Sequence, residues 1–194
     1  MLSIVTGDKS WFHHFDPETK WQSMEWHHLD SPTKKKPKTM PSAKKIMGTI
    51  FRDADGCILI QFLERGKTIN AAHFVQTLVK LCHALHDKRP RRKVILQHDN
   101  ARPHTACLTA EKIENMGWEV LPHPLYSPDL APSDYHLFGF VKIQMRGRHY
   151  ETNEALQTAV RQCLQAAGTE LCCKGIFKLL EQWEECVQRN RDYV

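Results

Sequence analysis

Two aspartates occupy positions from which carboxylates can carry out metal-dependent chemistry. Asp99 lies just after the short apolar run 94–96, which contains two β-branched residues. That pattern predicts a buried strand with a carboxylate beyond its carboxyl end, where chemistry gathers in open α/β sheets. Asp134 follows a proline-rich loop and begins the helical run 135–142. A carboxylate that ends a strand and another that begins a helix can converge on one metal ion.

A third carboxylate has several candidates. Asp8 lies within residues 3–15, whose β-branched and aromatic residues predict a strand that a bulge near Gly7 could interrupt. Residue type alone favours a surface aspartate beside a glycine turn. Asp129 is a rival, although the Ser-Pro pair before it also predicts a simple turn.

The elements that must position these residues follow from apolar periodicity and turn residues. Residues 46–51 and 57–63 predict a β-hairpin around a turn that ends in Asp-Gly, and this turn explains Asp53 and Asp55 without catalysis. A helix is expected to begin at Asn70, its cap. The remaining expected elements are a strand at 21–28, a helix at 105–116 closed by Gly117, a strand at 118–121, and helices at 153–165 and 168–189.

Composition restricts the class of protein. A chain of 194 residues with 41% hydrophobic and 25% charged residues is predicted to form one globular domain. No apolar run reaches the roughly 20 residues that span a bilayer, so no membrane partner is expected. The seven cysteines are scattered without a Cys-x-x-Cys pair, which predicts reduced thiols in a cytosolic or nuclear protein. His83 and His86 have metal-compatible spacing, but a helix surface is the favoured interpretation because no partner ligand is placed to close a zinc site.

The net charge of +5 is concentrated in two basic clusters. The first cluster lies in residues 30–45, which contain three prolines and are expected to form an extended loop. The second lies in residues 88–93. A solvated loop, a nuclear-import signal and a DNA-phosphate contact are all compatible with such lysines. The candidate DNA-binding residues are Lys34, Lys35, Lys36, Lys38, Lys44, Lys45, Arg91, Arg92 and Lys93.

The segments around the three aspartates resemble the catalytic domain of mariner-type transposases, in the Tc1/mariner superfamily. The matching motifs are Thr-Gly-Asp-Lys-Ser-Trp at 6–11, His-Asp-Asn-Ala-Arg-Pro-His at 98–104 and Tyr-Ser-Pro-Asp-Leu-Ala-Pro-Ser-Asp-Tyr-His-Leu-Phe at 126–138. In that family thirty-four residues separate two catalytic aspartates, which is the separation of Asp99 and Asp134 here. The motifs occur in the family's order, and the resemblance extends nearly to the last residue.

The resemblance implies an α/β, RNase H-like (retroviral integrase-like) fold over residues 1–194, with a mixed five-stranded sheet flanked by helices. It implies that Asp8, Asp99 and Asp134 are catalytic and hold two Mg²⁺ ions, for which Mn²⁺ can substitute. The implied reaction is hydrolysis at transposon ends followed by attack of the 3′-hydroxyl on target DNA, a cut-and-paste mechanism in the nucleus. The implied partners are DNA and, in the full-length protein, a second subunit that the 30–45 loop would reach. Asn100, Arg102 and His104 could orient phosphate or Asp99, although a turn also explains them.

Two departures from the family leave alternatives open. The family's amino-terminal helix-turn-helix region does not occur in these residues, so we expect a catalytic fragment or a truncated or domesticated remnant. Lys9 follows Asp8 where the family usually has an acidic residue; it could weaken metal binding or point away on the opposite strand face. The alternative function is therefore an inactive DNA-binding or dimerisation module. A generic RNase H-like nuclease is a third hypothesis, which the motif spacing disfavours.

Overall fold

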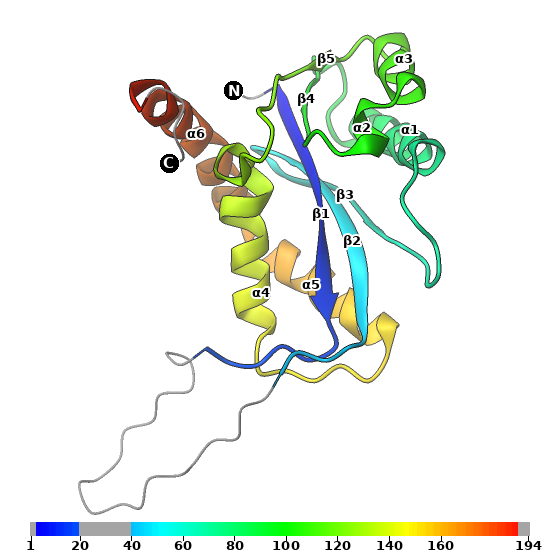
Figure 1. Cartoon of the computed structure of the whole chain (residues 1–194), viewed down its shortest axis with the longest axis vertical. Helices are drawn as coiled ribbons and strands as arrows, with labels where there is room; N and C mark the ends of the chain where they lie inside the picture. Colours follow the sequence, from blue (N-terminus) through cyan, green and yellow to red (C-terminus); the bar gives the residue numbers. More distant parts are fainter. Residues whose placement is uncertain (1–2, 20–39, 190–194) are drawn as a thin grey trace, which may run out of the picture.

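A mixed sheet organises the protein, and the computed structural model describes residues 3–19 and 40–189 of it. Five strands lie in the order β3-β2-β1-β4-β5 (Figure 1). β1, β2 and β3 pair antiparallel, whereas β4 and β5 continue the sheet parallel to β1. The strands are β1 (Ile4–His13), β2 (Lys45–Asp53), β3 (Gly56–Phe62), β4 (Ile95–Gln97) and β5 (Glu119–Val120). The expected mixed five-stranded sheet is confirmed.

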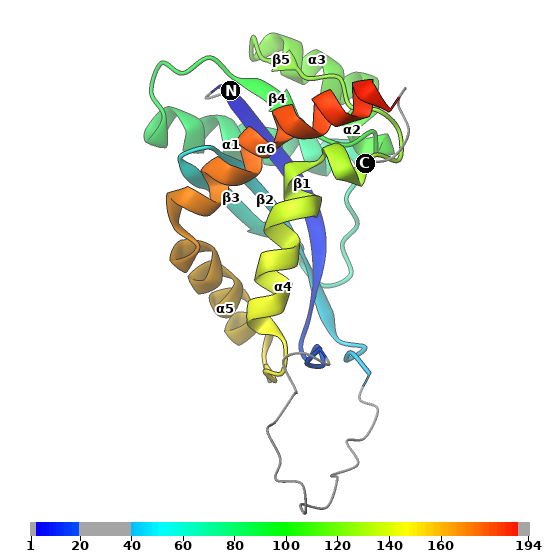
Figure 2. The ribbon, with the colours of Figure 1, turned by 90° about the vertical axis from the view of Figure 1, so that its left-hand side faces the viewer.

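Helices cover both faces of this sheet (Figures 1 and 2). One face carries α1 (Ala71–Lys88), α2 (Arg102–Thr105) and α3 (Cys107–Asn115). The other carries α4 (Gly139–Met145), α5 (Asn153–Ala166) and α6 (Gly168–Gln188). A 3₁₀ turn, η1 (Pro128–Leu130), and a π-helix, η2 (Ser133–Phe138), lead into α4. No helix in the described ranges is long and apolar enough to cross a membrane.

Alternation of side chains along the strands builds the two larger of the three apolar cores in the described residues. Phe51 packs with the apolar residues of α1, whereas its neighbour Ile50 packs with those of α4 and α5. In β1, Val5 packs in the core beside α1, and Phe12 packs in the core beside α4 and α5. Successive strand residues point to opposite faces, so a sheet covered on both sides needs apolar residues in both sets of positions.

Close packing explains Gly7, and the bulge considered there is wrong. The pairing of β1 with β2 runs without interruption from Thr6 to His13. A Cβ at Gly7 would lie 2.1 Å from the Phe51 ring, so glycine is needed for contact with the core rather than for a turn. The irregular pairing lies instead between β2 and β3, at Phe51 and Arg52.

Most of the other predicted elements are confirmed. The hairpin forms, Asn70 caps α1 by accepting a hydrogen bond from the His73 backbone N–H at 2.8 Å, and Gly117 has a φ of +67°. The helix expected at 105–116 is confirmed as α3 to within two residues, but the short helix α2 before it was not predicted, and the extended backbone at Ala106 separates the two. The predicted strand at 21–28 and most of the basic 30–45 stretch lie outside the described residues.

Candidate active site

Strand length brings Asp8 and Asp99 together. β4 pairs with β1 only as far as Gln97, which lies opposite Thr6. Beyond that point β1 continues with β2 alone, while the chain after β4 leaves the sheet. Asp8 and Asp99 therefore both lie just beyond the last paired residues of β1 and β4, at the carboxyl end of β4. Sites in α/β proteins are expected at this end of a parallel strand.

Asp134 comes from the helical layer on the α4 side of the sheet. It lies in the first turn of η2, and its backbone N–H donates to the Ala131 carbonyl at 2.9 Å. The same short helix is anchored by Phe138, whose ring packs edge-on against Phe12 of β1 at 6.4 Å between centroids. Asp134 itself is exposed, so the anchored turn presents a carboxylate to solvent next to β1.

The carboxyl groups of Asp8 and Asp134 are close enough for each to affect the pKa of the other. Burial, followed by the neighbouring Asp134, raises the pKa of Asp8 to about 7, although the backbone N–H of Lys9 donates to Asp8 Oδ1 at 2.6 Å and opposes this rise. Although Asp134 lies at the surface, partial desolvation of its carboxyl group beside its neighbours, together with the nearby Asp99, also raises its pKa. Two neighbouring carboxylates repel each other, so protonation of one of them is favoured.

Asp99 has the opposite electrostatics. Burial alone would raise its pKa, but contacts with His104 and Lys9 outweigh burial and hold the pKa below its usual range. His104 Nδ1 lies 2.5 Å from Asp99 Oδ1, and the His104 ring is buried and stacked on Phe74 at 4.0 Å. A fixed ring orients the carboxylate it contacts. The geometry therefore places His104 in the contact with Asp99 that an orienting role requires.

The two other residues suggested with His104 lie differently. The side-chain amide of Asn100 donates to the His123 carbonyl at 2.5 Å, and Arg102 is exposed at the start of α2. Asn100 and His123 line a cavity of about 340 Å³ between Asp99 and Asp134. This cavity gives access to the carboxylates from solvent.

Lys9 does not point away from the site. Its ammonium donates to Asp99 Oδ2 at 3.1 Å and lies 3.9 Å from Asp8 Oδ1. Of the two alternatives for this residue, the one that directs it away from the carboxylates is wrong. β1 has no β4 partner beyond Thr6, so the four-carbon side chain of Lys9 reaches Asp99 past the end of β4.

Gln97 is a positioning residue that sequence reasoning missed. Its side chain accepts a short hydrogen bond from the Thr6 hydroxyl and donates to the Leu130 carbonyl at 3.4 Å. It thereby joins β1, β4 and the loop that leads to Asp134, which are the three segments that supply the carboxylates. The available signal was a glutamine that ends an otherwise apolar strand.

Arg52 is a second missed residue and is fully buried. Its guanidinium donates to the Pro132 carbonyl at 2.7 Å and to the Cys172 carbonyl at 3.1 Å. The hydroxyl of Tyr135 also donates to α6, to the Gly175 carbonyl at 2.6 Å. These bonds fix the loop before Asp134 between the sheet and α6. An arginine near a strand end carries no sequence signal for such burial.

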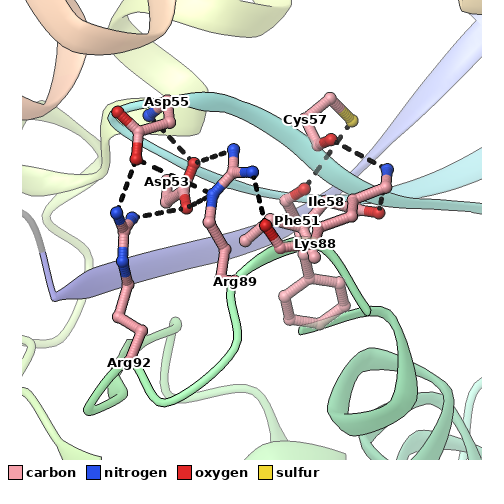
Figure 3. A network of polar contacts seen from close by, with 8 residues as sticks. All are labelled: Phe51, Asp53, Asp55, Cys57, Ile58, Lys88, Arg89 and Arg92. Atoms are coloured by element: carbon pink, nitrogen blue, oxygen red, sulfur yellow. Dashed lines mark hydrogen bonds and ion pairs between the residues drawn. The ribbon is translucent and has the colours of Figure 1, made fainter. Parts of the chain in front are cut away.

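The second basic cluster contributes to structure more than predicted. Arg89 and Arg92 converge on the fully buried Asp53 at the β2–β3 turn (Figure 3), with shortest distances of 2.7 and 3.0 Å to its Oδ2 atom. Arg92 also bonds Asp55 at 2.6 Å. These ion pairs favour a structural role for Arg92 over the predicted phosphate contact. Asp53 is likewise more than a turn residue, because it forms ion pairs with both arginines.

The remaining candidate DNA-binding residues are placed as follows. Arg91 is exposed with a φ of +63°, and the exposed Lys93 pairs with Glu119 at 2.7 Å. Lys44 is exposed, and Lys45 begins β2 with its ammonium 4.5 Å from the centre of the Trp11 ring. The others lie outside the described residues: Lys34, Lys35, Lys36 and Lys38.

The donor set of the candidate site fits a hard divalent cation. Three carboxylates from three segments are close enough to shift one another's pKa, and Mg²⁺ prefers oxygen ligands. In the described ranges, no group of three or more His, Cys, Asp or Glu side chains is already arranged to hold a metal. Asp99 is in ion pairs with Lys9 and His104, so its carboxylate would have to give up one of these contacts to bind a metal ion. His83 and His86 are exposed on α1, as the helix-surface interpretation predicts.

The sheet order, with carboxylates on β1, after β4 and in a following helix, defines the RNase H-like class. A family model described as "Transposase (partial DDE domain)" matches residues 16–95. The crystal structure of the catalytic domain of Mos1 mariner transposase is 35% identical, with a TM-score of 0.82 over all of this chain and 84% of that one. The chain belongs to the mariner transposases, and the expected fold is confirmed.

Longer relatives match in the same region. The mariner Mos1 transposase of Drosophila mauritiana is 36% identical over 98% of this chain and 56% of its own length. The histone-lysine N-methyltransferase SETMAR of Homo sapiens is 34% identical over 98% of this chain and 28% of its own length. A Mos1 transposase paired-end complex with the left transposon end has a TM-score of 0.89, 37% identity and the same 56% coverage. The chain thus spans about half the length of the Mos1 transposase and 28% of the length of SETMAR.

Proposed function

We propose that residues 1–194 form a transposase catalytic domain that hydrolyses phosphodiester bonds at transposon ends and joins the freed 3′-hydroxyl to target DNA. One observation carries this proposal: Asp8, Asp99 and Asp134 come from three separate segments and meet beside a solvent-accessible cavity. The same residue types at the same spacing define the family to which the chain belongs. Cut-and-paste transposition is the activity that this geometry supports best.

The proposed cofactor is a pair of Mg²⁺ ions, with Mn²⁺ as a substitute. Support comes from the relative, because Mos1 paired-end complexes have been solved with Mn and with Mg. Asp8 and Asp99 would hold ions in common, and Asp134 would complete the set for one of them. When bound, two such ions activate a water or hydroxyl nucleophile and stabilise the leaving oxygen.

The protein's own residues prepare this centre. His104, fixed by Phe74, orients Asp99, and Gln97 holds the three carboxylate-bearing segments in register. Asp8, whose pKa is raised to about 7, would lose its proton when a cation binds, so that it and Asp134 could both act as ligands. The cavity between Asp99 and Asp134 admits the scissile phosphate.

DNA and a second subunit are the proposed partners, and the nucleus is the proposed location. The supporting relatives are Mos1 complexes with paired transposon ends and a Mos1 strand transfer complex. Exposed cations of the described residues remain candidates for phosphate contact, namely Lys44, Lys45, Arg91 and Lys93. Lys34, Lys35, Lys36 and Lys38 lie outside the described residues and stay candidates from the sequence alone.

Nicking of supercoiled plasmid tests the proposal. The purified chain is incubated with plasmid in EDTA, Mg²⁺ or Mn²⁺, beside the variants Asp99→Asn and Asp55→Asn. We expect nicking that needs metal, falls by orders of magnitude in Asp99→Asn and is unchanged in Asp55→Asn, because Asp55 lies at the distant β2–β3 turn. A folded chain that binds DNA but does not nick it in either metal would contradict the enzymatic function and favour a DNA-binding module.

A further inference from the structure

The side chain of Lys9 enters the carboxylate centre, and residue 9 contacts two of the three aspartates. Its backbone N–H donates to Asp8 Oδ1 at 2.6 Å, and its ammonium donates to Asp99 Oδ2 at 3.1 Å. The ammonium is also 3.9 Å from Asp8 Oδ1, and the side chain is only 24% exposed. A positive charge therefore lies between the two carboxylates that would hold a metal in common.

The two oxygens of Asp99 have different partners. Oδ1 faces His104 Nδ1 at 2.5 Å and accepts the Ala101 backbone N–H at 3.2 Å. Oδ2 accepts from Lys9. The buried His104 ring and the backbone amide are fixed groups, whereas Lys9 has a flexible stem. The oxygen that can exchange its partner for a metal is therefore the one bound by Lys9.

We propose that Lys9 is a built-in competing cation, whose ammonium must leave its place between Asp8 and Asp99 before a divalent ion can bind both carboxylates. This inference rests on the proposed metal-dependent function. In this proposal, Lys9 sets the metal concentration at which the three carboxylates bind the ion. Lys9 also offsets carboxylate repulsion in the metal-free protein, where Asp8, Asp99 and Asp134 lie close together.

Two consequences with opposite signs follow. Removing the ammonium tightens metal binding, because the ion no longer displaces a bound cation. Removing it also destabilises the metal-free protein, because three neighbouring carboxylates lose a neutralising charge. A salt bridge of purely structural importance would produce only the second effect.

Direct Mn²⁺ binding provides the test, with free Mn²⁺ measured by electron paramagnetic resonance during titration of the protein. Lys9→Met keeps the length of the side chain without the charge, and Lys9→Arg keeps the charge. Lys142→Met is the matched control, since Lys142 acts on Asp134 through its charge alone. We expect the Mn²⁺ dissociation constant to fall on the order of tenfold in Lys9→Met, as for one partly screened charge contact, and to change by less than about threefold in the other two variants.

Thermal unfolding in EDTA supplies the second measurement. Lys9→Met is expected to unfold a few degrees below the wild type without metal, and saturating Mn²⁺ should remove or reverse this difference. Unchanged or weaker Mn²⁺ binding by Lys9→Met would overturn the role of Lys9. Mn²⁺ binding that persists in Asp99→Asn would instead overturn the assignment of the metal centre, so failure of the two proposals can be told apart.

Discussion

The buried carboxylate of Asp53 allows a sharp prediction about stability. Asp53 is fully buried and accepts bonds from Arg89 Nε at 2.7 Å, Arg89 Nη2 at 3.2 Å and Arg92 Nη1 at 3.0 Å. The three side chains connect the β2–β3 turn to the segment after α1 (Figure 3). Asp53→Asn removes the negative charge and can place an amide donor against a guanidinium donor.

The magnitude follows from the exposure of the partners. Loss of one member of a buried ion pair costs about 3–5 kcal/mol. The side chains of Arg89 and Arg92 remain 19% and 25% exposed, so water can solvate part of the released charge. We therefore expect Asp53→Asn to lower the free energy of unfolding by about 3 kcal/mol, the lower end of that range. The control Asp55→Asn, at a side chain that is 47% exposed, should cost less than about 1 kcal/mol.

Urea unfolding at pH 7, followed by far-ultraviolet circular dichroism, measures both variants. The midpoint should move to lower urea in Asp53→Asn, with little change in the slope of the transition. In a double-mutant cycle with Arg92→Met, the two losses should add up to more than the loss in the double variant. A loss in Asp53→Asn no larger than that in Asp55→Asn would refute the structural importance of this network.

Three further predictions concern the core, the carboxylates and the residue that orients Asp99. Gly7→Ala should lower the free energy of unfolding by about 3 kcal/mol in urea, because its Cβ would meet the Phe51 ring, whereas Gly139→Ala, with open space around its Cβ, should be neutral or stabilising. Because the pKa of Asp8 is raised to about 7, the free energy of unfolding in EDTA should fall as the pH rises from about 4 to 7. Asp8→Asn should reduce this fall. Equal slopes of unfolding free energy against pH in the variant and the wild type would count against the raised pKa of Asp8. His104→Phe keeps an aromatic ring in the stack but removes the Nδ1 contact, so plasmid nicking should fall about 10–100-fold; wild-type rates would exclude an orienting role.

Periodicity and turn chemistry predicted the elements whose sequences decide their own conformation. The hairpin has Asp-Gly at its turn, and the helix α1 has both a cap at Asn70 and an apolar stripe. The helix break at Ala106 was not predictable in this way, because residues 102–115 have helical character on both sides of it. Across the break, the Pro103 carbonyl accepts a hydrogen bond from the Thr109 hydroxyl at 2.7 Å.

The candidate site was predictable in its carboxylates but not in its cations. The resemblance to the family's motifs predicted Asp8, Asp99 and Asp134, and the structure brings these three carboxylates near one another. The positions of the charged groups of Lys9 and Arg52 were not predictable. Strand alternation determines the direction of each Cα–Cβ bond, but not where the end of a long side chain lies. One of these cations enters the carboxylate centre, and the other is fully buried against backbone carbonyls.

Anomalous scattering from crystals of the chain soaked in Mn²⁺ tests the central claim most directly. The account predicts two peaks roughly 3.5–4 Å apart, within ligand distance of Asp8, Asp99 and Asp134, with the Lys9 ammonium moved away from Asp99. The peaks should be absent in Asp99→Asn crystals soaked in the same way. A soak at a Mn²⁺ concentration that supports nicking, with no peak beside these three carboxylates, would contradict the account.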